Sequence, residues 1–236
     1  RRKHINHEFS KHNVNFEFFD ALTPETAENY ANSLGLNLND IGLTLGELAC
    51  MMSHVALWKK AIDENTPYIT IFEDDVYLGE DANRLLNDSE WIKSDWNIIK
   101  IETVLKKTIL AYKSYQVATV KREVTQLKSK HLGTGGYVLS LRGAMLFFDY
   151  INNTNLRPLD ELIFEEFIAK HNEPVYQMKP ALCIQEIILA GPNANLSLPS
   201  LLIEERKDRM KSDKIKNLNK ARRELNRIIL QTKKVI

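Results

Sequence analysis

The sequence has few cysteines and no long apolar run. Cys50 and Cys183 are the only two cysteines among 236 residues, and neither belongs to a Cys-x-x-Cys motif. This spacing argues against a structural zinc site and against dithiol redox chemistry. We expect both to be buried thiols in a reducing compartment. No apolar run approaches the ~20 residues of a membrane-spanning helix, and no signal peptide is visible.

A strong excess of one charge is also absent. The net charge is +1, with 44% apolar and 27% charged residues, which is typical of a soluble globular protein and argues against a general nucleic-acid binder. The length allows one domain, or one domain with an appendage. The charge is uneven, however: residues 204–236 contain twelve Lys and Arg against five Asp and Glu, a net of +7.

One short apolar segment runs directly into three acids, in the sequence Tyr-Ile-Thr-Ile-Phe-Glu-Asp-Asp-Val of residues 68–76. Adjacent carboxylates repel one another, so a buried strand gains no stability from ending in them. A divalent cation such as Mg²⁺ or Mn²⁺ would remove the repulsion. Alternation along the strand predicts that Glu73 and Asp75 share one face while Asp74 points away. The alternative is a polar turn with solvated acids.

Two further blocks accompany these acids. Residues 44–58 read Thr-Leu-Gly-Glu-Leu-Ala-Cys-Met-Met-Ser-His-Val-Ala-Leu-Trp, and residues 133–140 read Gly-Thr-Gly-Gly-Tyr-Val-Leu-Ser. Together, the three blocks resemble the family 25 glycosyltransferases, the group of lipooligosaccharide and collagen galactosyltransferases. The sequence departs from the family pattern at Ala49 and Gly136, and neither change removes a candidate ligand. Family members usually begin with an apolar strand, so we expect a short strand to precede Arg1.

The resemblance implies a GT-A-like (Rossmann-like) α/β fold, a mixed sheet flanked by helices. It also implies inverting transfer of a hexose, galactose before glucose, from a UDP-sugar to a saccharide acceptor of lipooligosaccharide or lipopolysaccharide. Asp75 with Glu73 would hold Mn²⁺ or Mg²⁺. The donor-site candidates are Asp20, Glu47, Ser53, His54, Asp74, Gly133, Thr134 and Gln185.

An inverting transfer needs a carboxylate base for the acceptor hydroxyl. The candidates are Asp160 first, then Glu186, with Glu102 as a third. Asp160 resembles the acid of a Pro-x-Asp element of the family, but it is equally interpretable as a helix N-cap.

Several of these residues also have structural interpretations. Thr44 and Glu47 form a capping box, which predicts that Glu47 serves the helix that follows. A lone helical His such as His54 is more often hydrogen-bonded packing than a ligand. The three glycines between residues 133 and 136 allow positive φ and close approach to a ligand, or simply a tight strand entry.

The pattern predicts strands over residues 15–21, 68–72, 96–101 and 137–139, and extended chain over residues 174–185. Residues 115–120 predict an edge hairpin outside the main sheet. Helices are expected after Thr23, after Thr44, over residues 142–152 and over residues 159–170, and residues 192–199 are expected to be a loop. Residues 1–200 would form the GT-A-like domain, and residues 201–236 a basic amphipathic helical extension.

Within that extension Ile215, Leu218, Leu225 and Ile229 form a helical stripe that Arg222 interrupts. A basic amphipathic helix is typical of contact with an anionic membrane surface or a partner helix, here a second copy in a homodimer. Packing on its own domain is the alternative. The segment contains no aromatic residue for stacking on bases, so a nucleic-acid role is not expected. We expect a cytoplasmic protein, peripheral at the inner face of a bacterial inner membrane.

Two other function classes stay open. A metal-dependent hydrolase would use a nucleophilic Asp at the first acid, but that position is Glu73. A catalytically inactive relative that binds carbohydrate or acts as a scaffold would keep the blocks without the turnover.

Overall fold

The computed structural model describes residues 1–39, 41–118, 120–191, 196–198, 205–206 and 208–211. Its centre is a six-stranded mixed sheet with the order β1-β7-β3-β8-β6-β5, in which only the β3–β8 pair is parallel. The strands are β1 (Tyr68–Phe72), β3 (Ile98–Lys100), β5 (Leu110–Gln116), β6 (Glu123–Leu127), β7 (Gly136–Ser140) and β8 (Val175–Lys179). This confirms the predicted mixed α/β sheet, and the arrangement is consistent with a GT-A-like fold.

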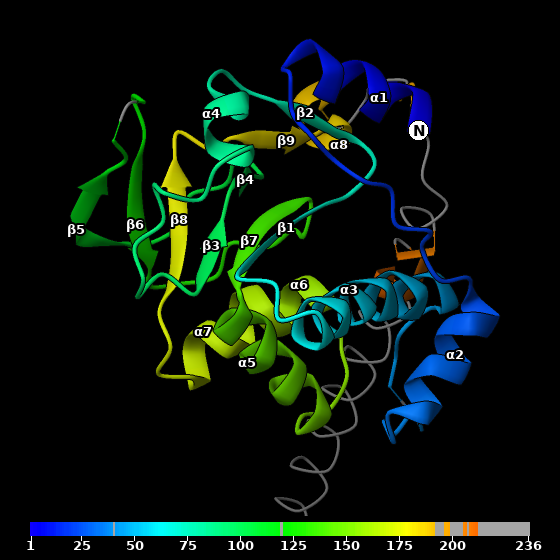
Figure 1. Cartoon of the computed structure of the whole chain (residues 1–236). Coiled ribbons are helices and arrows are strands. Elements are labelled where there is room, and N and C mark those ends of the chain that lie inside the picture. Colours follow the sequence, from blue (N-terminus) through cyan, green and yellow to red (C-terminus); the bar gives the residue numbers. More distant parts are fainter. Residues whose placement is uncertain (40, 119, 192–195, 199–204, 207, 212–236) are drawn as a thin grey trace, which may run out of the picture.

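Helices cover one face of this sheet (Figure 1). They are α2 (Pro24–Ser33), α3 (Leu45–Asp63), α5 (Leu141–Asn152), α6 (Leu159–Glu161) and α7 (Phe167–Lys170), with a π-helical turn over Leu162–Glu166 between the last two. Residues 159–170 are therefore helical as predicted, but the helix changes its hydrogen bonding just after Asp160. Such π turns often occur at functional sites.

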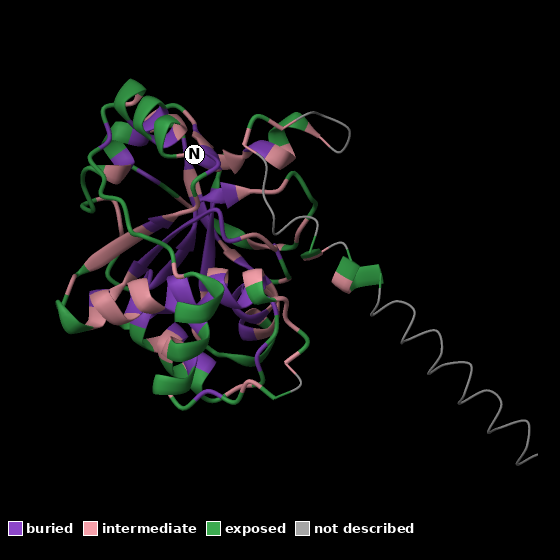
Figure 2. Ribbon diagram, turned by 90° about the vertical axis from the view of Figure 1, so that its right-hand side faces the viewer, coloured by how far each residue is buried: buried purple, intermediate pink, exposed green. Residues whose placement is uncertain are grey.

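The opposite face carries a smaller sheet and further helices. Its strands are β2 (Val76–Leu78), β4 (Glu102–Thr103) and β9 (Cys183–Gln185), in the order β2-β9-β4. Helices α1 (Arg2–Lys11), α4 (Ala82–Leu86) and α8 (Glu186–Ala190) accompany them. Ile98 and Ile99 illustrate how one strand serves both faces, because Ile98 packs in the helical core and Ile99 in the core beneath the small sheet. Figure 2 shows the central strands as the most continuously buried part of the molecule.

The two sheets meet where strands of the large sheet continue into strands of the small one. β1 leads through residues 73–75 into β2, and β3 leads through Ile101 into β4. The Glu73 N–H donates to the Gly135 carbonyl at 3.1 Å, and the Glu186 N–H donates to the Asp75 carbonyl at 2.9 Å. The three acids therefore bridge the two sheets, and their backbone is fixed on both sides.

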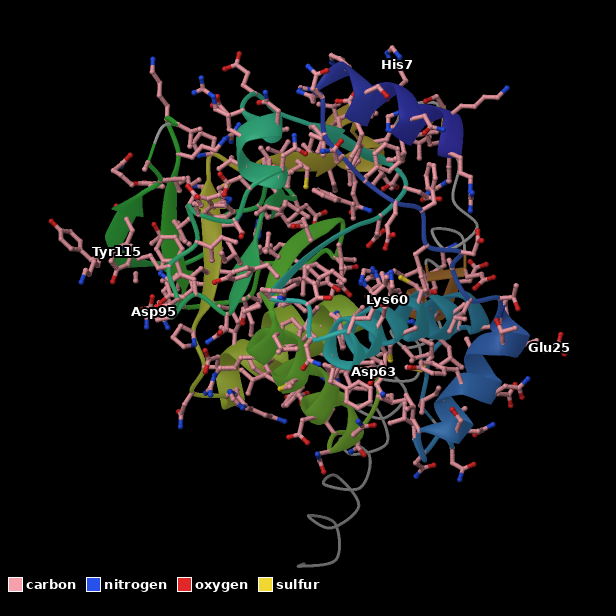
Figure 3. All side chains as sticks on the ribbon, viewed as in Figure 1. His7, Glu25, Lys60, Asp63, Asp95 and Tyr115 are labelled. Atoms are coloured by element: carbon pink, nitrogen blue, oxygen red, sulfur yellow. The ribbon has the colours of Figure 1, made fainter. Side chains whose placement is uncertain are left out.

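Two predictions about the elements are wrong. Residues 15–21, all of which the structure describes, have no regular secondary structure and belong to neither sheet. Phe16 instead packs its ring on Phe9 of α1 and on Phe18. The hairpin of β5 and β6 is at the edge as predicted, but it belongs to the main sheet, and residues 117–118 lie in its turn. Figure 3 shows its Tyr115 on the far side of the molecule from Glu25 of α2.

Candidate active site

Glu73 and Asp75 are held together by side chains from two other segments. The Thr134 hydroxyl donates to Glu73 Oε1 at 2.6 Å. Gln185 Nε2 lies between the two acids and donates to Glu73 Oε2 at 3.0 Å and to Asp75 Oδ1 at 3.2 Å. Asp74 is turned outward, with a half-exposed side chain paired to Arg1. The alternation predicted from the sequence is therefore observed.

The two carboxylates are unfavourable together without a cation. Burial, followed by the neighbouring charge of Asp75, raises the pKa of Glu73 to about 8. Burial also raises the pKa of Asp75. Gln185 supplies only a neutral donor between them, and rotating its amide would present an oxygen instead. Two carboxylates and an amide oxygen at one point form a set of hard ligands that suits Mg²⁺ or Mn²⁺, so the residues present fit such an ion.

The glycine-rich segment packs against a buried ion pair. Lys100 and Glu102 have fully buried side chains, and Lys100 Nζ donates to Glu102 Oε2 at 2.8 Å and to the Gly133 carbonyl. The Gly135 N–H donates to the same carboxylate oxygen at 3.0 Å. A Cβ on Gly135 would lie 2.7 Å from both Glu102 Oε1 and Gln185 Cγ. The glycine therefore allows Glu102 and Gln185 to approach the backbone closely. Because Glu102 is fully buried and pairs with Lys100 through Oε2, it is poorly placed to contact an acceptor.

His131 lies just before this glycine segment and is buried, and its backbone N–H donates to the Phe164 carbonyl. Burial, and then the charge of Lys100, lowers the pKa of His131 to about 4. As the pH falls, the imidazole of the unfolded chain therefore binds a proton before the buried imidazole of the folded protein does. The contribution of the neutral His131 to stability is fully present above pH 6.5 and is lost as the pH falls toward 4. Between pH 7 and pH 5 we expect the free energy of unfolding to decrease less in His131→Gln than in the wild type, with a difference on the order of 1 kcal/mol. Urea unfolding at the two pH values measures this, and equal losses in both proteins would contradict it.

Three candidates lie on α3 and are strongly engaged with the protein itself. Glu47 forms the predicted capping box with Thr44, at 3.0 and 3.1 Å, and also pairs with Arg209. The Ser53 hydroxyl donates to the Ala49 carbonyl and accepts from the Leu22 N–H. His54 is buried and shares a hydrogen bond of 2.6 Å with the Tyr137 hydroxyl, and burial lowers its pKa to about 4. The imidazole is therefore neutral near pH 7.

The Tyr137 hydroxyl connects α3 to β7, since it also accepts from Trp58 Nε1 at 2.9 Å. Tyr137→Phe would leave both His54 and Trp58 without this partner in the core. We expect the free energy of unfolding to fall by about 1–3 kcal/mol. Chemical denaturation measures this, with Tyr112→Phe as the matched control because Tyr112 is fully exposed. An equal effect in both variants would contradict the structural role of the hydroxyl.

The two leading base candidates differ in what already occupies their oxygens. Asp160 lies inside α6, for which Pro158 is the N-cap, so its interpretation as an N-cap is wrong. It pairs with Arg206 Nη2 at 3.1 Å through both oxygens, and Oδ2 accepts from the Gly133 N–H at 3.3 Å. Glu186 accepts from the Ser197 N–H and hydroxyl through one oxygen and from the Leu198 N–H through the other. Glu186 therefore anchors residues 197–198.

The remaining candidates lie at the exposed side. Asp20 is almost fully exposed and pairs with Arg2. Arg1, besides contacting Asp74, is 3.9 Å from Asp75 Oδ2 and donates to the Leu198 carbonyl. Cys183 is buried as predicted, whereas Cys50 is partly exposed.

Sequence reasoning missed the cations of this site. Arg1, Arg206 and Arg209 reach Asp75, Asp160 and Glu47 from opposite ends of the chain, and no local pattern connects such distant residues. Lys100 had a usable signal, because it and Glu102 are two residues apart along an apolar strand and so share a face.

Comparison with known proteins gives consistent matches. The model of glycosyltransferase family 25, described as LPS biosynthesis protein, matches residues 1–163. The lipooligosaccharide biosynthesis protein lex-1 of Haemophilus influenzae is 35% identical over 97% of this chain and 84% of its own. The lacto-N-neotetraose biosynthesis glycosyltransferase LgtB of Neisseria meningitidis serogroup B is 37% identical over 87% of this chain and 78% of its own. The lipooligosaccharide biosynthesis protein lic2B of Haemophilus influenzae is 38% identical over 79% of this chain and 71% of its own.

Proposed function

Because this chain belongs to glycosyltransferase family 25, we propose that it transfers a hexose from a UDP-sugar to a saccharide acceptor in lipooligosaccharide or lipopolysaccharide biosynthesis. Galactose is the proposed sugar and glucose the second choice, and the anomeric configuration is inverted. The observation that carries the proposal is the Glu73–Asp75 pair at the junction of the two sheets, with Gln185 between the two carboxylates.

The proposal includes a divalent metal, Mn²⁺ or Mg²⁺. Asp75 and Glu73 would hold it, with Gln185 turned to present its amide oxygen. When bound, such an ion neutralises charge on the departing diphosphate. Thr134 keeps Glu73 in position through its 2.6 Å hydrogen bond, and the buried Lys100–Glu102 pair keeps the glycine segment in place behind it.

The chain's own residues would supply the remaining chemistry. Asp160 takes the proton of the acceptor hydroxyl while the oxygen of that hydroxyl forms a bond to the anomeric carbon of the sugar. The bond from that carbon to the diphosphate oxygen breaks, and UDP leaves with the electron pair. Oδ1 of Asp160 contacts only Arg206 among the described hydrogen bonds, so it retains a lone pair for the acceptor.

A donor screen tests the proposal. The protein is mixed with Mn²⁺ and with UDP-galactose, UDP-glucose, a GDP-sugar or a CMP-sugar, and the melting temperature is recorded with and without EDTA. A donor at ~100 times its dissociation constant adds about 2.7 kcal/mol of stability. UDP-galactose is expected to stabilise most, and only with the metal. Stabilisation by the GDP- or CMP-sugar alone would overturn the donor. Binding without release of UDP in the presence of acceptor oligosaccharides would favour a catalytically inactive relative.

We also propose that the basic C-terminal region brings the protein to an anionic membrane surface. None of the helices in the described part of the chain has both the length and the apolar character that spanning a bilayer requires. Residues 212–236 contain eight Lys and Arg against two acids, and each cation near such a surface contributes about 1 kcal/mol. The apolar stripe and the homodimer contact predicted for this segment lie outside the described residues. Removing residues 212–236 keeps Arg206 and Arg209 in the chain.

That deletion separates the two proposed partners of the region. Membrane association predicts binding to liposomes that rises with anionic lipid, collapses at high salt and is lost in the shortened protein. Pairing through the C-terminal helices predicts that the deletion halves the mass in solution. Liposome binding that survives the deletion unchanged would contradict the membrane role.

A further inference from the structure

Two side chains on one turn of α3, Cys50 and His54, have no part in the chemical step proposed above, although the family resemblance makes His54 a donor-site candidate. Cys50 and His54 are four residues apart, so they lie on the same face of the helix. Glu73, from the end of β1, completes a group in which one ligand atom of each residue lies within 4.8 Å of the others. Cys50 and Glu73 are partly exposed and His54 is buried, so solvent reaches two of the three.

We propose that Cys50, His54 and Glu73 form a binding site for a borderline-soft divalent cation, Zn²⁺ in the first place. A thiolate, an imidazole and a carboxylate are the three ligand types that Zn²⁺ takes in proteins, and three protein ligands leave a fourth position for water. This set differs in kind from the all-oxygen position between Glu73 and Asp75, since the thiolate favours Zn²⁺ over Mg²⁺ or Mn²⁺.

The distances agree with a site that closes on its ion. Neighbouring ligand atoms around a tetrahedral Zn²⁺ are about 3.5 Å apart, as bond lengths of 2.0–2.3 Å require. Because the ligand atoms lie no more than 4.8 Å apart, reaching that spacing takes a side-chain movement of about 1 Å or less. Cys50 is partly exposed, so its side chain can make this movement while Glu73 keeps its hydrogen bonds to Thr134 and Gln185. Binding forms the bond from Cys50 Sγ to the metal and releases the thiol proton to solvent.

Two of the three ligands are already oriented by outer hydrogen bonds, as metal ligands in proteins usually are. The Tyr137 hydroxyl bonds His54 Nδ1, which leaves the other ring nitrogen for the ion, and Trp58 in turn fixes Tyr137. Thr134 donates to one oxygen of Glu73 and Gln185 to the other, at 2.6 and 3.0 Å.

Because the site shares Glu73 with the oxygen-ligand position, an ion bound to Cys50 competes for that carboxylate. Zn²⁺ would then inhibit any activity that needs Glu73, whatever the donor sugar is. The site itself can be tested without substrate.

The experiment uses Co²⁺, a spectroscopic substitute for Zn²⁺, added to the full chain after treatment with EDTA and dialysis. We expect a thiolate-to-cobalt charge-transfer band in the near ultraviolet, removed by one equivalent of Zn²⁺. Cys50→Ser should abolish the band. Cys183→Ala should retain it and is the matched control, since Cys183 is the second thiol of the chain and lies outside the group. Tyr137→Phe should weaken binding by roughly 10–100-fold, the usual effect of losing an outer-shell partner.

Alkylation gives a second readout that does not depend on absorption. Zn²⁺ should protect Cys50 from iodoacetamide in the folded wild-type protein, as measured by peptide mass spectrometry, and His54→Gln should remove the protection. Circular dichroism confirms that each variant is folded. A charge-transfer band that persists in Cys50→Ser, or alkylation of Cys50 at the same rate with and without Zn²⁺, would overturn the proposal.

Discussion

Asp75→Asn is expected to lower kcat by about 10²–10³-fold, the usual effect of losing a main electrostatic stabiliser of a transition state. Asp75 is buried, lies beside Glu73 and shares the Gln185 amide with it. Asparagine keeps the shape and one oxygen but removes the charge that a divalent ion needs. Release of UDP from UDP-galactose, followed at several Mn²⁺ concentrations, measures the effect.

The variant should remain folded, because burial opposes the charge of Asp75 in the absence of a cation. Its melting temperature without metal should therefore be equal to that of the wild type or higher, while the stabilisation by Mn²⁺ should disappear. Asp63→Asn is the matched control, since Asp63 is exposed, pairs with Lys59 and lies near the C-terminal end of α3 (Figure 3). Full turnover by Asp75→Asn, or by the wild type in EDTA, would exclude the assignment of Asp75 as a metal ligand.

The local features of this site could be predicted from the sequence, because short-range geometry determines them. Thr44 and Glu47 are three residues apart and form the capping box as expected. Alternation along an extended chain placed Glu73 and Asp75 on one side and Asp74 on the other. The helices over residues 142–152 and 159–170 followed from their apolar periodicity, which tertiary packing reinforces here.

Features that depend on the partner of a segment could not be predicted in this way. Residues 15–21 contain three phenylalanines, which favour a strand, but a strand also needs a neighbour with free backbone groups. The small sheet is completed by β4 and β9, and α1 instead supplies Phe9 as a ring partner. Gln185 reaches the acids because β9 pairs with β2, so that Gln185 lies opposite Val76.

The glycines show how one pattern permits two outcomes. Three glycines between residues 133 and 136 predict close approach of another group, and the structure identifies protein side chains as the groups that approach. A Cβ at Gly133 would lie 2.8 Å from Glu102, and one at Gly135 would lie 2.7 Å from Gln185. The sequence indicated that space was needed, but the identity of the occupant depended on the course of β4 and β9.

The ion pair between Arg206 and Asp160 allows an experiment to distinguish two roles of Asp160, that of the general base and that of a structural anchor. If Asp160 only anchors the segment around Arg206, then Asp160→Asn and Arg206→Gln remove the same ion pair and should have similar, modest effects. If Asp160 accepts the proton of the acceptor hydroxyl, Asp160→Asn removes the base, whereas Arg206→Gln removes only a contact of that base.

We expect Asp160→Asn to lower kcat by about 10²–10⁴-fold, the range typical of a lost general base, while the KM for the donor changes little. Arg206→Gln should lower kcat far less, and Arg206→Lys should restore part of that loss because it restores a cation near Asp160. The pH profile of kcat adds a criterion, since the limb that reports the base should vanish only in Asp160→Asn. Glu186→Gln serves as the comparison, because both oxygens of Glu186 accept hydrogen bonds from residues 197–198. If Asp160→Asn keeps more than about one tenth of the wild-type kcat, its loss of activity is smaller than the removal of a general base would cause. If Glu186→Gln in turn keeps less than that fraction, the base is Glu186, and Asp160 is an anchor for the C-terminal region.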